Sequence, residues 1–261
     1  MKIRSLLLLA GICFFGFVKA QDTSLYKKEW FISGTDTLPY RILLPQNYDA
    51  NKKYPIIFFL HGAGERGNNN EAQLTHGSGL FLRDSIREKY PAIVVFPQCS
   101  AKSFWSNVQF KMDTVTKKRE FLFQEEGTPT IAMVLAQGLL EKLMKDLSVD
   151  KKRVYITGLS MGGMGTFEMV RRNPKLFAAA MPICGGANTA TASKLTKTKW
   201  WVFHGDADPV VPESLSKNMV DALKAVNADV QYTVYPGVGH DSWNNAFAEP
   251  RFLMWLFSQH K

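Results

Sequence analysis

A serine flanked by glycines lies near the middle of the chain, where a predicted strand meets a predicted helix. Ser160 is the centre of the sequence G-L-S-M-G (158–162), after the apolar run Arg153–Thr157 and before the helical pattern Met161–Arg171. A sharp strand-to-helix turn projects a serine hydroxyl from a sheet, and glycines two positions away on either side avoid clashes. A helix that begins directly after the serine also points its positive end at developing negative charge. The motif predicts that Ser160 is the nucleophile of a covalent acyl transfer.

A glycine-rich turn, H-G-A-G (61–64), directly follows the apolar run Pro55–Leu60. Such a turn at the end of a strand can aim backbone N–H groups at an oxyanion. In serine hydrolases with a G-x-S-x-G turn, one donor comes from this loop and the other from the residue after the nucleophile. We therefore expect the N–H groups of Ala63 and Met161 to form an oxyanion hole, with Gly64 as the alternative to Ala63. Each donor can stabilise the transition state by about 3–4 kcal/mol.

Chain order distinguishes the five histidines as candidates for the general base. With this type of serine turn, the order along the chain is nucleophile, acid, histidine. Two histidines precede Ser160, His204 precedes the acid candidates, and His260 is next to the C-terminus, where order is poor. His240 remains, after the loop P-G-V-G (236–239), and we predict that it is the base.

Two carboxylates compete for the role of the acid. The stretch H-G-D-A-D-P-V-V-P (204–212) follows the apolar run Trp200–Phe203 and contains Asp206 and Asp208. One of them should orient and stabilise the imidazolium of the base, while the other caps the turn. Their spacing does not choose between them.

Apolar runs that alternate with helical patterns predict an α/β domain with a mostly parallel sheet. The predicted strands are Glu29–Ile32, Tyr40–Leu44, Pro55–Leu60, Ala92–Phe96, Arg153–Thr157, Ala178–Ile183, Trp200–Phe203 and Val230–Tyr235. The predicted helices are Leu74–Arg87, Ile131–Leu147, Met161–Arg171, Glu213–Val226 and Asn244–Phe257. Continuous apolar strands are expected where helices cover both faces of the sheet.

The first twenty residues have the pattern of a secretory signal peptide. Lys2 and Arg4 precede an apolar run from Leu6 to Val18, and V-K-A (18–20) offers a cleavage site before Gln21. A retained membrane anchor is the alternative, but the run is shorter than the ~20 residues that a spanning helix needs. We expect cleavage, secretion or a periplasmic location, no stable membrane insertion afterwards, and one catalytic domain over residues 21–261.

Charge and cysteines limit the partners. Cleavage would remove three cations and no acid, which lowers the formal net charge from +9 to +6. A basic surface can favour acidic polysaccharides or anionic membranes. The chain has no arginine-rich helix or basic-aromatic platform, so we expect no nucleic-acid partner. Cys99 and Cys184 could form a disulfide or stay as buried thiols. Metal-ligand spacings such as C-x-x-C do not occur, so we expect neither a metal nor a cofactor.

Residues 103–127 do not fit the alternation. The segment is long, charged and aromatic, and loops of this length are uncommon unless they are lids or binding loops. We interpret it as an insertion near the mouth of the site, and the alternative is a surface hairpin without a role. Trp105 and Trp243 could line an acyl or sugar pocket, or pack in the core or at the rim.

Four motifs in this order resemble the esterase, depolymerase and predicted-peptidase branch of the α/β-hydrolases, near polyhydroxybutyrate depolymerases, feruloyl esterases and dienelactone-hydrolase-like proteins. The matching stretches are H-G-A-G-E-R-G (61–67), G-L-S-M-G-G (158–163), H-G-D-A-D-P-V-V-P (204–212) and G-H-D-S-W (239–243). The resemblance implies the α/β-hydrolase fold, with a mostly parallel eight-stranded sheet and helices on both faces. It also implies that Asp208 is the acid and Asp206 a turn residue.

Ester hydrolysis is the activity that the resemblance favours, because most relatives with this loop pattern are esterases. An exported enzyme would suit acetyl or feruloyl esters of plant or microbial polysaccharides. A prolyl-oligopeptidase-like peptidase is the second possibility, although such enzymes usually carry a gating domain for which this chain is too short. A lipid-ester hydrolase is the third, although the chain lacks a long apolar lid. A hypothesis from another class is an inactive hydrolase fold that serves as a binding module, but such a protein would be expected to have lost one of Ser160, Asp208 and His240.

Overall fold

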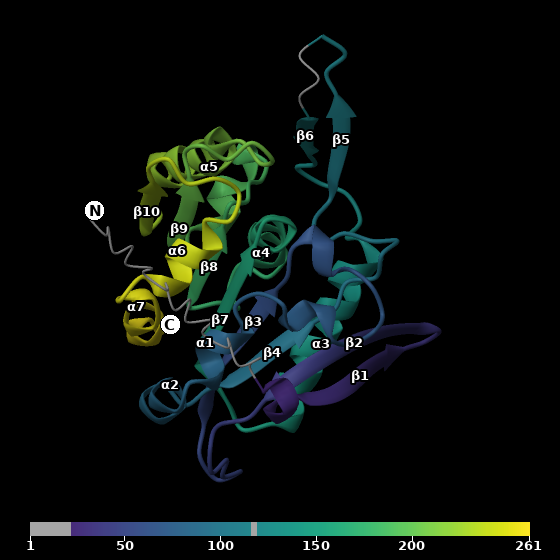
Figure 1. Ribbon diagram of the computed structural model, residues 1–261, viewed down its shortest axis with the longest axis vertical. Coiled ribbons are helices and arrows are strands. Elements are labelled where there is room, and N and C mark those ends of the chain that lie inside the picture. Colours follow the sequence, from purple (N-terminus) through teal and green to yellow (C-terminus); the bar gives the residue numbers. More distant parts are fainter. Residues whose placement is uncertain (1–21, 116–118) are drawn as a thin grey trace, which may run out of the picture.

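The computed structural model describes residues 22–115 and 119–261, and its centre is an eight-stranded sheet (Figure 1). The strand order is β1-β2-β4-β3-β7-β8-β9-β10; β2 is antiparallel to both β1 and β4, and the other neighbours are parallel. This confirms the predicted α/β-hydrolase fold. The strands are β1 (Lys27–Ser33), β2 (Asp36–Leu43), β3 (Tyr54–Leu60), β4 (Ile93–Pro97), β7 (Val149–Leu159), β8 (Ala179–Ile183), β9 (Lys199–Gly205) and β10 (Val230–Tyr235).

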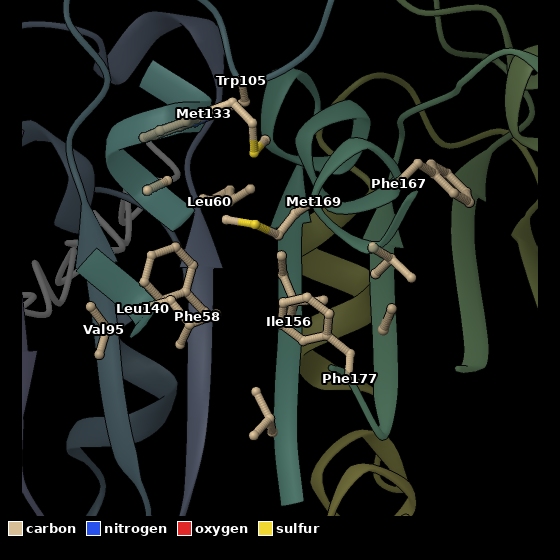
Figure 2. Packing of buried hydrophobic residues seen from close by; sticks show 14 of the residues in the cluster. Phe58, Leu60, Val95, Trp105, Met133, Leu140, Ile156, Phe167, Met169 and Phe177 are labelled. Carbon is tan, nitrogen blue, oxygen red and sulfur yellow. The ribbon is translucent and has the colours of Figure 1, made fainter. Parts of the chain in front are cut away.

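Helices cover both faces of the sheet, and alternate residues of each central strand are buried against one face or the other. In β3, the side chains of Phe58 and Leu60 join one apolar cluster while those of Ile57 and Phe59 join another. Figure 2 shows Phe58 and Leu60 packed among methionines and leucines of the first cluster. That cluster includes α3 (Ile131–Asp146), α4 (Met161–Arg172) and α5 (Glu213–Ala225); the second includes α1 (Ser78–Leu82), α2 (Asp84–Lys89), α6 (Trp243–Ala248) and α7 (Phe252–Ser258).

The predicted helix Leu74–Arg87 is wrong as one element, because the chain forms η3 (Ala72–Leu74), α1 and α2 instead. Gly77 adopts a left-handed conformation with φ +79°, and a Cβ there would lie 2.6 Å from the ring of Phe59. A glycine is therefore required where the chain turns against β3. Arg83 has an extended backbone with ψ 126°, and it therefore separates α1 from α2.

The predicted helix Asn244–Phe257 is also wrong as one element, since α6 ends at Ala248 and α7 begins at Phe252. Pro250 lies between them. A proline disfavours the helical conformation of the residue before it, and Glu249 is extended, with ψ 118°. Both short helices still pack on the same face of the sheet.

Residues 103–127 contain an antiparallel hairpin of β5 (Val108–Met112) and β6 (Arg119–Phe123), which forms a two-stranded sheet of its own. Figure 1 shows the hairpin standing away from the body of the domain, above the end of α4. Its base leaves the body after Trp105, which is fully buried. The remaining short elements are the 3₁₀ helices η1 (Thr23–Leu25), η2 (Ala63–Glu65) and η4 (Thr189–Leu195).

Three expectations concern the ends and the cysteines. The predicted signal peptide lies outside the described residues. Within residues 22–115 and 119–261, the structure has no helix long and apolar enough to cross a membrane. Cys99 and Cys184 are both buried free thiols, so of the two alternatives the structure has the unbridged one.

Candidate active site

Ser160 occupies a strained turn between β7 and α4. Its backbone has φ +54° and ψ −117°, outside the regions that a residue with a side chain normally adopts. The turn is tight: a Cβ at Gly158 would lie 2.4 Å from the carbonyl oxygen of Gly162, and one at Gly162 would lie 1.9 Å from that of Leu60. Both glycines of the G-x-S-x-G motif are therefore required by close backbone packing.

The side chains of Ser160, His240 and Asp208 form a hydrogen-bonded chain, called the triad below. Nε2 of His240 is 2.9 Å from Oγ of Ser160, and Nδ1 is 2.7 Å from Oδ2 of Asp208. Because an ionised carboxylate only accepts, Nδ1 carries the proton and Nε2 is free to accept from the serine hydroxyl. The three residues follow the carboxyl ends of β7, β9 and β10, and meet at one edge of the sheet.

Asp208 is surrounded by hydrogen-bond donors. Its Oδ1 accepts from the N–H groups of Val210 at 2.8 Å and Val211 at 2.9 Å, while Oδ2 faces both His240 and His204. Burial by itself would raise the pKa of this carboxyl. The donors outweigh burial, the two histidines most of all, and hold the pKa of Asp208 well below its usual range. The carboxylate therefore stays ionised.

The structure also distinguishes Asp206 from Asp208, between which the spacing in the sequence did not choose. Oδ1 of Asp206 accepts a hydrogen bond from the N–H of Gly237 at 2.7 Å, and so fixes the loop that precedes His240. Asp208, three residues after the end of β9, faces the imidazole itself.

His204 is a neighbour of Asp208 that the sequence analysis does not predict. Its side chain is fully buried, and Nε2 lies 3.2 Å from Oδ2 of Asp208 and 2.9 Å from the carbonyl oxygen of Val211. Both partners are acceptors, so Nε2 carries the proton. Nδ1 is 2.7 Å from Oγ of Ser216. Chain order excludes His204 as the base, but it gives no information about the contact between His204 and Asp208, four residues further along the chain.

The loop expected to hold an oxyanion lies beside Ser160. Ala63 is the first residue of η2, and Met161 is the first residue of α4. The N–H of a first helical residue has no acceptor within its own helix. Ala63, Gly64, Met161 and Ser160 all line one cavity, so these donors and the hydroxyl share the same space.

His61 holds this loop in place from below. Its buried ring donates from Nδ1 to the carbonyl oxygen of Gly62 at 2.6 Å and accepts from the N–H of Cys99 at 2.9 Å. Trp105 donates from Nε1 to the carbonyl oxygen of His61 at 3.2 Å. Burial lowers the pKa of His61 to about 4, so the ring stays neutral and keeps this pattern of one donor and one acceptor.

The cavity above Ser160 has a volume of about 290 Å³, at the lower end of the range for small-molecule sites. The ring of Trp243 packs against that of His240 with centroids 5.4 Å apart. Of the two tryptophans considered from the sequence, Trp243 lines the cavity while Trp105 is core. Three phenylalanines complete the apolar wall: Phe104, Phe110 and Phe121.

One group of described residues approaches metal-ligand geometry, with ligand atoms of Cys184, Asp208 and His240 within 4.8 Å of one another. Burial raises the pKa of the Cys184 thiol well above its usual value, so this sulfur stays protonated. Asp208 and His240 already bind each other through a hydrogen bond. The donor set therefore suits proton transfer better than metal ligation.

The sheet, the strained serine turn and the hydrogen-bonded triad geometry are those of a serine-type α/β-hydrolase. Residues 47–251 match the Phospholipase/Carboxylesterase family, and the chain belongs to that family. It is a hydrolase of the carboxylesterase-like class.

Several esterases are similar to this chain. A solved thermostable esterase is 33% identical, with a TM-score of 0.81 over 91% of this chain and 64% of the other. A probable feruloyl esterase C of Aspergillus oryzae is 24% identical over 78% of this chain and 67% of its own length. An endo-1,4-beta-xylanase/feruloyl esterase of Xylanibacter ruminicola is 25% identical over 85% of this chain, which spans only 31% of that longer protein.

Proposed function

We propose that this protein hydrolyses carboxylic esters through an acyl-enzyme on Ser160, and that its substrates are acetyl or feruloyl esters of plant or microbial polysaccharides. The observation that carries the mechanism is the continuous hydrogen-bonded chain from Ser160 Oγ through His240 to Asp208, with spacings of 2.9 and 2.7 Å. The acid, the base and the nucleophile are thus already aligned for proton transfer.

In the first step, Oγ of Ser160 attacks the ester carbonyl carbon while Nε2 of His240 accepts the hydroxyl proton. The carbonyl oxygen becomes an oxyanion, which the N–H groups of Ala63 and Met161 stabilise. Asp208 stabilises the imidazolium and keeps Nδ1 as the donor. Collapse of the intermediate breaks the bond to the alkoxide, which leaves as the alcohol with the proton from Nε2.

In the second step, water replaces the alcohol. His240 accepts a proton from the water as its oxygen attacks the acyl carbon. The bond to Ser160 Oγ then breaks, and the serine recovers its proton from Nε2. The acid is released, and all the groups that the two steps need are supplied by the protein and water.

The substrate class is supported by the cavity and by the relatives. The rings of Phe104 and Trp243 offer an apolar wall that suits an aromatic acyl group. Relatives include probable feruloyl esterases and a bifunctional acetylxylan esterase/xylanase of Neocallimastix patriciarum, 25% identical over 75% of this chain. The export signal predicted at residues 1–20 is consistent with a polymeric substrate outside the cell.

Replacement of Ser160 or His240 by alanine tests the mechanism. We expect each variant to lower kcat for 4-nitrophenyl acetate by roughly 10⁴–10⁶-fold, because members of such a triad act as a unit. The control is Ser258→Ala at the end of α7, whose hydroxyl donates to the carbonyl oxygen of Trp255 and accepts from the side-chain amide of Gln259, and which does not line the cavity. A fluorophosphonate reagent should label the wild-type protein at Ser160, as peptide mass spectrometry would show. Equal rates in the wild type and Ser160→Ala would overturn the mechanism.

The substrate class needs a separate measurement, the release of acetate and ferulate from acetylated and feruloylated xylan. Hydrolysis of 4-nitrophenyl acetate without release from either polymer would leave the acyl-enzyme mechanism standing and refute the polysaccharide-ester assignment. Cleavage of peptide substrates at Ser160 in place of esters would instead support the peptidase alternative.

A further inference from the structure

The hairpin β5–β6 has two chemically different faces. Residues directly opposite each other on antiparallel strands share a face. Gln109 is opposite Leu122, and Lys111 is opposite Glu120, so one face is largely polar. The other face, called the aromatic face below, carries three cross-strand pairs: Val108 with Phe123, Phe110 with Phe121, and Met112 with Arg119.

The aromatic face continues the wall of the active-site cavity. Phe110, Phe121 and Arg119 line the same cavity as Ser160. Phe104 connects the hairpin to the body: its ring centroid is 5.2 Å from that of Phe110, which in turn is 5.4 Å from that of Phe121. A substrate whose ester reaches Ser160 therefore has a surface along which its remaining part can extend.

Much of this surface is open to solvent. Phe110 is 42% exposed and Met112 is 54% exposed, although both are apolar and lie on an ordered strand. Exposed apolar surface on a projecting element is characteristic of a binding surface.

Buried ion pairs fix the base of the hairpin to the helix that follows the nucleophile. Glu168 of α4 binds both Arg171 and Arg172, and all three side chains are largely buried. The two arginines then donate to the carbonyl oxygens of Glu125 at 2.8 Å and Gly127 at 3.0 Å. Because α4 begins next to Ser160, the aromatic face is held at a defined position relative to the nucleophile.

Arg119 gives this surface a charge. Its guanidinium lies 5.4 Å from the centre of the Phe110 ring. Among residues 22–115 and 119–261, its guanidinium forms no salt bridge with a carboxylate. The only carboxylate among the described residues that line the cavity is Glu65, which faces His76 at 3.7 Å. A guanidinium stacked on an aromatic ring is well suited to bind a carboxylate in two-pronged geometry.

We propose that the aromatic face binds the part of the substrate beyond the scissile ester, and that Arg119 selects esters whose glycan carries a carboxylate, as a uronic acid does. This inference rests on the proposed esterase function and narrows its substrate class. A neutral lipid chain could use the phenylalanine rings but would leave Arg119 without a partner. The net charge of +9, or +6 after the predicted cleavage, favours an acidic substrate in the same way.

The test compares kcat/KM for two acetylated xylo-oligosaccharide fractions, one neutral and one with a single glucuronic acid branch. We expect the wild type to prefer the acidic fraction roughly tenfold, mainly through KM, as a charged hydrogen bond would provide. Arg119→Gln should bring this ratio close to one, and Arg119→Lys should keep part of it. The matched control is Lys111→Gln, a cation on the polar face of the same hairpin, which should keep the full ratio.

A second measurement needs no variant. The wild-type ratio of kcat/KM for the acidic and the neutral fraction should decrease when NaCl is raised from about 50 to about 500 mM, because salt screens an exposed contact. The same ratio in the wild type and Arg119→Gln, together with normal hydrolysis of 4-nitrophenyl acetate, would overturn the inference and leave the esterase function intact. Failure to hydrolyse any of the esters would refute the esterase function itself. A dimer that Phe110→Ala dissociates, seen by analytical ultracentrifugation, would show that a second copy covers this face and would also overturn the inference.

Discussion

Asp208 accepts hydrogen bonds from two histidines, and only one of them faces the serine. In the proposed mechanism, this bond keeps His240 in the tautomer that accepts the proton of Ser160. His204 contacts the same oxygen, Oδ2, from a fully buried position. It also links the acid loop to Ser216, whose Oγ lies 2.7 Å from Nδ1 of His204 and 3.0 Å from the carbonyl oxygen of Gly185. We therefore interpret His204 as a positioning residue that fixes the carboxylate.

Replacement of His204 by phenylalanine tests this role. Asp208 would lose one donor, so we expect kcat for 4-nitrophenyl acetate to fall roughly 10–100-fold with little change in KM, as for loss of a charged hydrogen bond. Fewer donors raise the pKa of this carboxyl only toward its usual value of 3.8, so Asp208 stays ionised above pH 5 and the fall in kcat should persist from pH 5 to about 9. Steady-state kinetics across this range would measure kcat and KM.

The control for this prediction is His204→Gln, which keeps an N–H donor and an acceptor and should recover part of kcat. Thermal unfolding of both variants separates catalysis from stability. If His204→Phe lowered only the melting temperature and left the kcat profile in place, His204 would be structural and the positioning role would be wrong.

At the scale of elements, the packing of α4 against the end of β3 determines where the nucleophile lies. Gly162 is in the first turn of α4, and a Cβ there would lie 1.9 Å from the carbonyl oxygen of Leu60. A backbone atom cannot move aside as a flexible side chain can, so the helix itself would have to shift away from the strand.

We expect Gly162→Ala to lower the free energy of unfolding by about 2–3 kcal/mol, as overpacking does, or to prevent recovery of folded protein. The matched control is Gly64→Ala in the neighbouring loop, where a Cβ would have nothing within 4 Å. Its stability should change by less than about 0.5 kcal/mol. Urea unfolding monitored by tryptophan fluorescence would compare the two. Wild-type stability in Gly162→Ala would contradict the close packing described here.

The same elements show how far the sequence could predict the structure. Continuous apolar runs such as Pro55–Leu60 predicted the strands β3, β4, β7, β8, β9 and β10, because a strand covered on both faces has few polar positions. The first two strands were predicted from short runs around a turn, and β1 is mostly exposed. The predictions of Leu74–Arg87 and Asn244–Phe257 as single helices were wrong. The first break depends on a tertiary contact, that of Phe59 against Gly77, and the second on the single residue Pro250. The sequence predicts no strands in the hairpin, because the half-exposed alternation between Arg119 and Phe123 is a weak signal.

The residues of the candidate site could be predicted from the sequence more fully than the contacts around them. Ser160 and His240 followed from local motifs and chain order, while Asp208 needed the family resemblance because Asp206 is equally close in sequence. The contact between His204 and Asp208 and the aromatic wall at Phe110 could not be predicted in this way. Both arise where segments far apart in the chain, or on a projecting hairpin, come together in space.

At the scale of the whole molecule, the site is assembled from loops spread from residue 61 to residue 240, at the carboxyl ends of β3, β7, β9 and β10. Such a site exists only while the entire sheet is folded. Conditions that destabilise the fold should therefore remove activity in the same transition. His61 links the stability of the fold to the site most directly, since it is buried beneath the oxyanion loop and can titrate.

Burial lowers the pKa of His61 from 6.5 to about 4 in the folded protein, whereas the unfolded chain keeps the ordinary value. Between these two values the unfolded state binds the extra proton, so the free energy of unfolding must fall as the pH falls through this window. Above pH ~6.5 both states are neutral at this residue and its effect is constant. We expect the titration of His61 to lower the free energy of unfolding by about 2–3 kcal/mol when the pH is lowered from ~7.5 to ~4.5.

Urea unfolding at those two pH values would measure this loss in the wild type, His61→Asn and His76→Asn. Other groups titrate as well, so the prediction concerns the difference between variants. His61→Asn should be less stable at pH 7.5, because asparagine cannot match the hydrogen bonds to both Gly62 and Cys99, but its further loss at pH 4.5 should be smaller by about 2–3 kcal/mol. His76, which is partly exposed, should keep the wild-type difference when replaced. An equal loss in all three proteins would mean that His61 is protonated in the folded state at pH 4.5, and that the oxyanion loop tolerates a charged ring beneath it.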